Sequence, residues 1–556
     1  MERATDDDSP DRPLSELIDD RSDIAELRPR IKERARELRA AGDDAHVEDL
    51  LALTRKNDTA YISDADMAKA EWAAEMYEYA NDHFREQRDD GELDAADMDW
   101  TPDGDVMIAP RKLHYFLGGS GKTTRDGRPV ENNTHCWGEL REGLRWAQIL
   151  GLVDADAIKD KRNPSPQGPA ITIASDGSVE DASPARDRGP ARVLDEVGPF
   201  EIDTGYRKPN VPTEIRRPEL RHEDADDLIS TVAEDLVDTA FQRVRYDALS
   251  QQAYYVEVWC EKSGIIPQSL SAEYGVTRRP AGGGEMSYQM CRQAIEIAAA
   301  REQGLVIILL TDYDPKGSDM PKSAARKLEV EAAFHDTEVQ LHHAGVTRAQ
   351  VQEYELRTTP ANDPSGDAAN PGRKAYEGHT ETFEAYAGQD PVEVDAFAAD
   401  YPGEFRQAIA DYIEPYYDDA LATRIEAATE DAKQEALRLV RRRLSEDEIA
   451  VEDAVADLQR AIDAYIDRMA PGFEAAEASL EALADEAREQ REEHKLDQRR
   501  DELKDAIRMD FRDALADVEV DLPDPDADGR EGPLLDTRRG FFEQVDWYKA
   551  NDIREE

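Results

Sequence analysis

The sequence predicts a multidomain α and α/β protein: an N-terminal helical, winged-helix-like module, a Rossmann-like domain with a parallel sheet, and long C-terminal helices. Two apolar, β-branched runs end in carboxylates, one at Glu261 and the other at Asp312 and Asp314, and a helix-like stretch lies between them. This pattern is typical of neighbouring parallel strands. Helical periodicity dominates residues 26–92 and 416–518, and 556 residues exceed what one hydrophobic core supports.

Composition divides the chain into six segments: 1–25, disordered; 26–165, the helical module; 166–224, a linker; 225–415, the α/β domain; 416–518, charged helices; and 519–556, a tail with a docking helix. The linker is rich in Pro, Gly, Ser and Asp. Strand patterns recur at 338–342 and 392–394, so we expect four or more parallel strands. The charged helices have apolar stripes, which favour packing against each other or a dimer partner.

The charge balance is extreme, with 125 Asp and Glu against 69 Lys and Arg and a net charge of −56. The acidic residues are spread along the whole chain, and hydrophobic residues still make up 39% of it, enough for folded domains. This composition resembles the adaptation of halophiles to molar intracellular salt. The alternative, a disordered acidic protein, does not fit the apolar strands. An acidic surface with this origin does not argue against DNA as a partner.

Cysteine usage and the N-terminus exclude several classes of protein. The three cysteines, Cys136, Cys260 and Cys291, are far apart, so neither a disulfide framework nor a zinc site is indicated. The first residues lack the basic and apolar regions of a signal peptide. No apolar run approaches the ~18–20 residues of a membrane span. We therefore expect a cytoplasmic protein without a membrane partner.

The strongest functional candidates are the carboxylates of Glu261, Asp312 and Asp314 at the expected strand ends. Open α/β sheets bind ligands in the crevice outside the carboxyl ends of their strands. Carboxylates that converge there repel each other unless a hard cation lies between them, and Mg²⁺ is the usual choice. The sequence therefore predicts a magnesium site built for phosphate chemistry. The alternative is the ordinary use of Asp and Glu at strand ends and helix N-caps.

A second candidate is Tyr115, which lies in the segment Arg-Lys-Leu-His-Tyr-Phe-Leu at 111–117. A phenol is a poor nucleophile near its ordinary pKa of ~10. The adjacent charges of Arg111 and Lys112 would favour the phenolate. A phosphotyrosyl ester conserves the energy of the cleaved bond, so a tyrosine suits reversible DNA cleavage better than hydrolysis. From spacing alone, a tyrosine in an apolar helix is more often part of a core.

Together these motifs resemble a known family. The Glu on one strand and the Asp-x-Asp on another resemble the Toprim domain, the metal-binding fold of topoisomerases, primases and some nucleases. Asp-Tyr-Asp-Pro-Lys-Gly at 312–317 is similar to the version in the A subunit of topoisomerase VI, a type IIB enzyme, and in the meiotic break-forming protein. Arg111 and Tyr115 match the Arg-x-x-Tyr-Tyr motif of that group, whose second Tyr attacks DNA, while His114 replaces the first Tyr.

A broader likeness is to stand-alone bacterial, viral and archaeal Toprim proteins, over the stretches 55–58, 70–72, 112–115, 130–137 and 158–164. The resemblance implies that Glu261, Asp312 and Asp314 hold Mg²⁺ against a DNA phosphodiester. It implies catalytic roles for Tyr115, Arg111 and Glu261. It also implies a homodimer in which one chain's tyrosine meets the other's metal site. No ATPase module is visible, so ATP-driven strand passage would need a separate B-type subunit.

A DNA substrate requires cations concentrated near the site. The candidates follow the motifs already named and are Lys112, Lys122, Arg125, Arg128 and Lys316. Each could instead pair with a neighbouring carboxylate, which is the commoner outcome for a surface cation. Counterion release contributes little in molar salt, so affinity there must depend on metal bridging and shape.

The leading hypothesis is therefore a topoisomerase-like enzyme that cleaves and rejoins DNA. One alternative keeps the metal without the tyrosine, as a Toprim nuclease that hydrolyses DNA. Another is a non-catalytic DNA-binding or assembly protein that uses the fold and the long helices as a scaffold.

Overall fold

The computed structural model describes residues 11–551 with gaps, and statements below about absent features concern only those residues. The gaps fall at 92, 94–97, 102–103, 155, 159–165, 168–170, 174–178, 182–203, 208–217, 222–224, 244–246, 263, 282–285, 315, 359–390, 446–450, 476–479, 516–517, 519 and 528. The chain forms two compact units, the first of residues 1–183, 252–418 and 526–556 and the second of residues 184–251 and 419–525.

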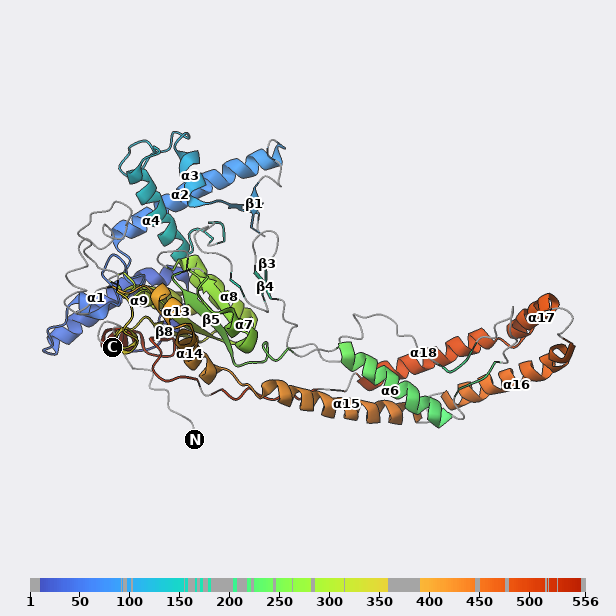
Figure 1. Ribbon diagram of the computed structural model, residues 1–556. Helices are drawn as coiled ribbons and strands as arrows, with labels where there is room; N and C mark the ends of the chain where they lie inside the picture. Colours follow the sequence, from blue (N-terminus) through green and yellow to red (C-terminus); the bar gives the residue numbers. More distant parts are fainter. Residues whose placement is uncertain are drawn as a thin grey trace. The chain divides into compact units, whose positions relative to one another are not determined.

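The centre of the first unit is a five-stranded sheet with the strand order β6-β5-β7-β8-β9. In that order the strands are Thr277–Pro280, Tyr254–Cys260, Gly304–Leu310, Val339–Gly345 and Leu535–Asp536. Strands β5 and β8 of this sheet are labelled in Figure 1. The first four are parallel to one another, and β9 pairs with β8 in the antiparallel direction. The prediction of a mixed α/β fold with a largely parallel sheet is confirmed.

Helices cover both faces of this sheet, as expected for parallel strands. One face carries α7, α13 and α14, whose bounds are Gln268–Tyr274, Val394–Asp400 and Pro402–Ile413. The other carries α8, α9 and α19, whose bounds are Tyr288–Ala300, Met320–Ala332 and Phe541–Ala550. A short helix, α10 (Arg348–Glu353), follows β8. Residues of β5 and β7 alternate between the two cores, so both central strands are buried on both sides.

The sheet differs from the expected pattern in two places. The stretch between β5 and β7 holds the helices α7 and α8 but also the edge strand β6, which the sequence reading did not anticipate. Residues 392–394, expected to form a strand, contribute a single antiparallel bridge from Val392 to Tyr313, and Val394 already begins α13. Both valines are fully buried, so their apolar pattern reflects packing on the sheet face and not a strand.

The helical module of the first unit contains α1, α2, α3 and α4 and a two-stranded β1–β2 pair. Their bounds are Ile24–Ala40, Asp64–Asp89, Pro110–Leu117, Thr134–Ile149, Asp99–Trp100 and Val106–Met107. Helices α2 and α4 approach closely because residue 143 is glycine. A Cβ there would lie 2.5 Å from the carbonyl oxygen of Lys69. The module shares one apolar core with Tyr288 and Val330, from α8 and α9.

Residues 11–25 differ from the expected disorder. They contain two 3₁₀ turns, Leu14–Glu16 and Arg21–Asp23, and the side chains of Leu14 and Ile18 are buried in the module core. Residues 1–10 lie outside the described residues, as does most of the expected linker. Within that linker the described residues include β3 (Ile171–Ile173) and β4 (Val179–Asp181), which pair with each other.

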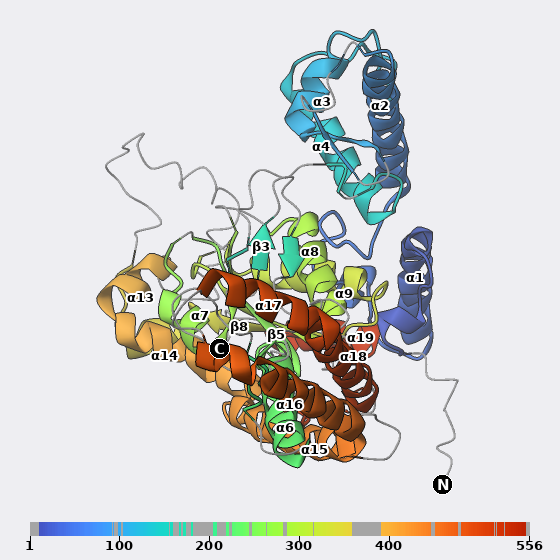
Figure 2. The ribbon, with the colours of Figure 1, turned by 90° about the vertical axis from the view of Figure 1, so that its right-hand side faces the viewer.

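The second unit is a set of long helices around one apolar core (Figure 2). It contains α15, α16, α17 and α18, with bounds Leu421–Ser445, Val451–Ala475, Leu480–Glu493 and Leu496–Leu515. Helix α6 (Ala225–Arg243) packs against α15 and α16 in this unit. The α/β block predicted to begin at residue 225 therefore starts, in the sheet, only at Tyr254.

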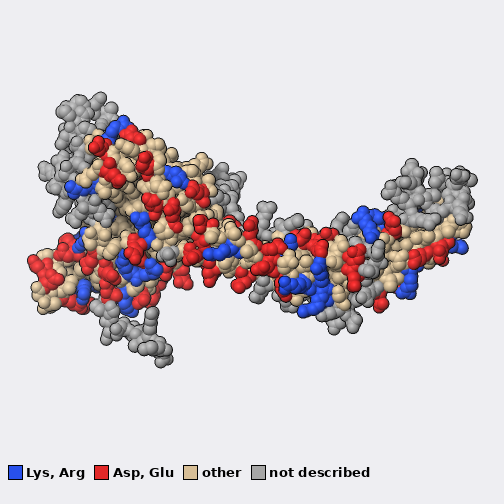
Figure 3. All heavy atoms as spheres, turned by 60° about the horizontal axis from the view of Figure 1, so that its bottom comes forward, with Lys and Arg blue, Asp and Glu red and all other residues tan. Residues whose placement is uncertain are grey.

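Acidic side chains are spread over the surface shown in Figure 3, and Lys and Arg form smaller clusters among them. Among the described residues, no helix is long and apolar enough to cross a membrane.

Candidate functional site

The sheet brings Glu261, Asp312 and Asp314 to the same edge. Strands β5 and β7 are parallel and in register, with Cys260 opposite Leu310, and Glu261 N donates to Leu310 O at 3.1 Å. The three carboxylate residues follow these two strand ends directly. They are 8%, 5% and 7% exposed, respectively, so all three side chains are buried.

The turn after β7 is unusually tight and fixes the two aspartates. Backbone N–H groups of Lys316 and Gly317 donate to Asp314 Oδ1. A Cβ at residue 317 would lie 1.9 Å from the carbonyl oxygen of Asp312, so only glycine fits there. The hydroxyl of Thr311 donates to Gly317 O at 3.1 Å and closes the same turn.

Asp312 is held from two sides. Its Oδ1 accepts from the backbone N–H of Val394 at 2.9 Å, at the start of α13. Its Oδ2 lies 3.0 Å from the ammonium nitrogen of Lys262, which is also 3.6 Å from Glu393 Oε2. Lys262 is the residue directly after Glu261, so the acidic site carries its own counter-charge.

The electrostatics of the site show an excess of buried negative charge. Burial, reinforced by the charges of Asp312 and Asp314, raises the pKa of Glu261 to about 7. Burial also raises the pKa of Asp312, against the opposing effects of the Val394 N–H and Lys262. That Asp312 and Asp314 both act on Glu261 shows that the three carboxylates are electrostatic neighbours.

Three oxygen-donor carboxylates in a buried site fit a hard divalent cation such as Mg²⁺. In the described part of the chain, however, no group of three or more His, Cys, Asp or Glu side chains is arranged as a metal site. Asp312 faces Lys262 and Asp314 faces backbone N–H groups. A metal would therefore have to compete with these partners for the carboxylate oxygens.

Tyr115 is not a core residue. Its side chain is 54% exposed, and its hydroxyl accepts a hydrogen bond from Arg111 Nη2 at 3.3 Å, one helical turn earlier on α3. Arg111, through this hydrogen bond and its charge, and Asn132 hold the pKa of Tyr115 below its ordinary value. The exposed position and the guanidinium neighbour are what a nucleophilic tyrosine needs.

His114, which replaces the first Tyr of the family motif, is fully buried, in contrast to the exposed Tyr115. Its Nε2 lies 3.2 Å from the carbonyl oxygen of Glu131. Burial lowers its pKa, so the neutral ring is favoured. Its direct partner is the Glu131 carbonyl and not the Tyr115 hydroxyl, so His114 anchors the helix.

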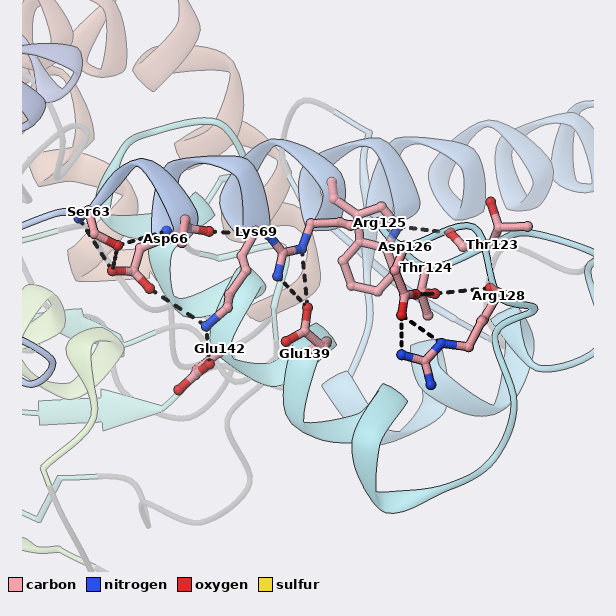
Figure 4. Close-up of polar contacts among 12 residues, drawn as sticks. Ser63, Asp66, Lys69, Thr123, Thr124, Arg125, Asp126, Arg128, Glu139 and Glu142 are labelled. Carbon is pink, nitrogen blue, oxygen red and sulfur yellow. Dashed lines mark hydrogen bonds and ion pairs between the residues drawn. The ribbon is translucent and has the colours of Figure 1, made fainter.

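The two arginines among the predicted DNA-binding cations are paired with carboxylates. Arg125 pairs with Glu139 at 2.7 Å and Arg128 pairs with Asp126, both on or beside the loop between α3 and α4 (Figure 4). These two pairs follow the commoner outcome for a surface cation.

The lysines among these candidates have different surroundings. Lys112 Nζ contacts Met98 Sδ at 2.7 Å, and Lys122 Nζ lies 4.0 Å above the centre of the Tyr79 ring. Lys316 is exposed, and its charge lowers the pKa of Glu261, which places it beside the carboxylates. Of the predicted set, Lys316 alone acts on the acidic site.

Several residues of the site were missed from the sequence. Lys262 and Glu393 join the acidic cluster, and Asn132 and Trp137 lie around Tyr115 and Arg111. For Lys262 the position next to Glu261 was a usable signal. The stretches that contain Trp137 and Glu393, 130–137 and 392–394, were noted in the sequence, but the proximity of these two residues to the site depends on how distant elements pack.

No model of a known protein family, no curated protein and no solved structure matches this chain. What the chain does is therefore inferred from its residues and their geometry.

Proposed function

We propose that this chain is a topoisomerase-like enzyme that cleaves and rejoins DNA, with Tyr115 as the attacking residue. The observation that carries the proposal is the exposed phenol of Tyr115, hydrogen-bonded to Arg111 and not packed in a core. The phenolate oxygen would attack a backbone phosphorus, forming a phosphotyrosyl ester while the phosphorus–sugar oxygen bond breaks. The leaving sugar oxygen takes up a proton from water, which balances the proton that the phenol lost. The resulting sugar hydroxyl can give up that proton again, attack the phosphorus and release the tyrosine, which reseals the strand.

The acidic cluster is proposed as the second half of this site, in a sheet of the Toprim type. Glu261, Asp312 and Asp314 would hold Mg²⁺, which supplies positive charge to the phosphate and to the leaving oxygen. The buried carboxylates support this role, since a divalent cation would offset both the burial and the neighbouring negative charges that raise the pKa of Glu261. Lys316 would bind a phosphate beside them.

The proposed assembly is a homodimer on DNA. In the described residues, the interactions of Tyr115 stay within its own module, with Arg111, His114 and Asn132. A dimer in which the tyrosine of one chain meets the acidic cluster of the other would complete the site. A separate B-type ATPase subunit would be needed for strand passage.

The test is to trap the covalent complex. Purified protein is incubated with supercoiled plasmid and Mg²⁺ in molar KCl and quenched with detergent. We expect a protein–DNA adduct that Tyr115→Phe and Asp312→Ala abolish. Tyr401→Phe, which removes a hydroxyl elsewhere in the same unit, serves as the matched control and should retain the adduct. Wild-type protein that forms no adduct would refute the nucleophile.

The interactions of Tyr115 lie within its own module in the described residues, and this favours one alternative, a metal-dependent nuclease. In that case water and not the phenol attacks the phosphorus, and the products are free ends. DNA cleavage that survives Tyr115→Phe but is lost in Asp312→Ala would select the nuclease.

A further inference from the structure

The guanidinium of Arg111 is stacked on two aromatic rings. Its Cζ lies 5.1 Å from the centre of the Tyr115 ring and 5.1 Å from the centre of the Trp137 ring. Arg111 and Tyr115 are one turn apart on α3, whereas Trp137 comes from the first turn of α4. A guanidinium within about 6 Å of a ring centre is attracted to the face of the ring, and tryptophan is the strongest partner.

Trp137 is itself firmly placed. It is half-buried, and its ring centre lies 5.6 Å from that of His114, which is buried and held at the carbonyl of Glu131. The α4 N-terminus is fixed by Asn133, whose Oδ1 accepts from the N–H of Cys136 at 2.9 Å. An exposed arginine normally samples many rotamers, so a fixed indole beside it restricts where the guanidinium lies.

We propose that Trp137 is a positioning residue for the nucleophile: its indole holds the Arg111 guanidinium at the Tyr115 hydroxyl, in the arrangement from which the tyrosine attacks. The inference rests on the proposed role of Tyr115. The groups that act on the phenol are Arg111 from its own helix and Asn132 from the loop before α4, with the His114 ring 6.2 Å away. Trp137 acts on the phenol through Arg111.

The test measures ionisation of Tyr115 in the full chain without DNA. Protein labelled with ¹³C at tyrosine Cζ is titrated by NMR, and the Tyr115 signal is identified by its loss in Tyr115→Phe. Trp137→Leu should raise the pKa of Tyr115 towards its ordinary value, as Arg111→Ala does, and Trp137→Phe should raise it less because phenylalanine retains a weaker ring face. An unchanged titration in Trp137→Leu, with a shifted one in Arg111→Ala, would overturn the proposal.

A folding defect does not remove the test. If Trp137→Leu does not fold, Trp137→Phe carries the measurement alone, and a Tyr115 titration identical to the wild type would again overturn the inference. Adduct formation at a fixed pH below the Tyr115 pKa should fall about two- to five-fold in Trp137→Leu, the size expected for one exposed cation–π contact.

Failure of the two proposals can be told apart. A shifted titration in Trp137→Leu together with no adduct from wild-type protein would retain the positioning role and reject the cleavage activity. An adduct from wild-type protein with no shift in the variant would do the reverse.

Discussion

At the scale of single residues, Gly317 determines whether the turn after β7 can form. The position of a Cβ on residue 317 would be only 1.9 Å from the Asp312 carbonyl oxygen. We predict that Gly317→Ala destabilises the protein by roughly 1–3 kcal/mol, as overpacking does, and displaces Asp312. Mg²⁺ binding, measured by calorimetry in molar KCl, should weaken together with the thermal midpoint.

Gly119→Ala is the matched control for this change. A Cβ there meets no atom within 4 Å, so the thermal midpoint and the Mg²⁺ affinity should both match the wild type. A Gly317→Ala protein as stable as this control would show that the turn is not constrained as described.

His342 provides a pH-dependent test at the same scale. It lies on β8, is 2% exposed, and its Nε2 is 2.6 Å from the Tyr416 hydroxyl. Burial, reinforced by the charges of Arg530 and Arg539, lowers the pKa of His342 from 6.5 to about 3. The unfolded chain therefore takes up a proton that the folded chain cannot. Stability from this group is complete above pH 6.5 and is lost as the pH falls towards 3.

We predict that the wild type loses roughly 2 kcal/mol of stability from His342 between pH 7.5 and pH 5. His342→Gln, which keeps a donor for Tyr416, should not show this loss. Urea unfolding at both pH values measures the difference, and His135→Gln at an exposed position is the control that should keep the wild-type dependence. Parallel pH profiles for the wild type and His342→Gln would contradict the assignment.

The sequence predicts part of the candidate site at this scale and not the rest. Glu261, Asp312 and Asp314 could be placed together because each follows a strand end, and parallel strands end at one edge. The orientation of α3 could not be predicted. The buried side chain is the polar His114 and the exposed one is Tyr115, the reverse of what polarity favours. That choice depends on the Glu131 carbonyl and on Trp137, which a local pattern does not contain.

At the scale of elements, the strands that could be predicted are those whose own sequence carries an apolar pattern. β7 is an apolar run and β5 is one interrupted by Glu257, as a parallel sheet buried on both faces favours. β8, Val-Gln-Leu-His-His-Ala-Gly, carries polar residues between its apolar ones. The edge strand β6 is Thr-Arg-Arg-Pro, and Arg279 within it is 1% exposed. It can be buried because Glu257 of β5 accepts two hydrogen bonds from its guanidinium, each 2.7 Å long. Only the folded pairing of β5 with β6 makes that arginine compatible with a strand.

The β5–β6 pairing therefore depends on one buried ion pair. Tyr255 Oη and Trp259 Nε1 also donate to Glu257, so the carboxylate is fully surrounded by donors. We predict that Arg279→Met destabilises the first unit by about 3–5 kcal/mol, because Glu257 is left charged and buried. Adding Glu257→Gln should recover part of the loss. Urea unfolding in molar KCl, followed by tryptophan fluorescence, measures both.

Arg278→Met is the matched control, because Arg278 is half-buried and its Nη2 bonds Gln167 Oε1 at a longer 3.4 Å. Its effect should stay below about 1 kcal/mol. Equal losses for the two variants would mean that the ion pair has no special role in the sheet.

At the scale of the whole molecule, the net charge of −56 opposes folding through electrostatic repulsion. Such a charge destabilises a compact state by self-repulsion. Salt screens this repulsion, and the distance over which it acts, the Debye length, falls from ~10 Å at 0.1 M to ~3 Å at 1 M. Exposed carboxylates on the long helices, such as Glu426, Asp431, Glu486 and Glu489, carry part of this repulsion. We predict that the folded fraction, measured by circular dichroism, rises steeply as KCl increases from 0.1 to 2 M.

The decisive comparison is a variant with those four carboxylates replaced by their amides. This variant removes charge at exposed positions without changing the core, so its unfolding midpoint in KCl should move to lower salt. Four conservative Asp↔Glu exchanges at the same positions are the control and should leave the midpoint unchanged. If both variants require the same KCl as the wild type, the salt dependence arises from hydrophobic burial and not from repulsion.

DNA binding should weaken over the same range of salt, because released counterions favour binding less as KCl rises. The amide variant would then fold at lower salt, where the proposed contact of Lys316 with a phosphate would be strongest, so it would be the form in which to test the proposed DNA cleavage.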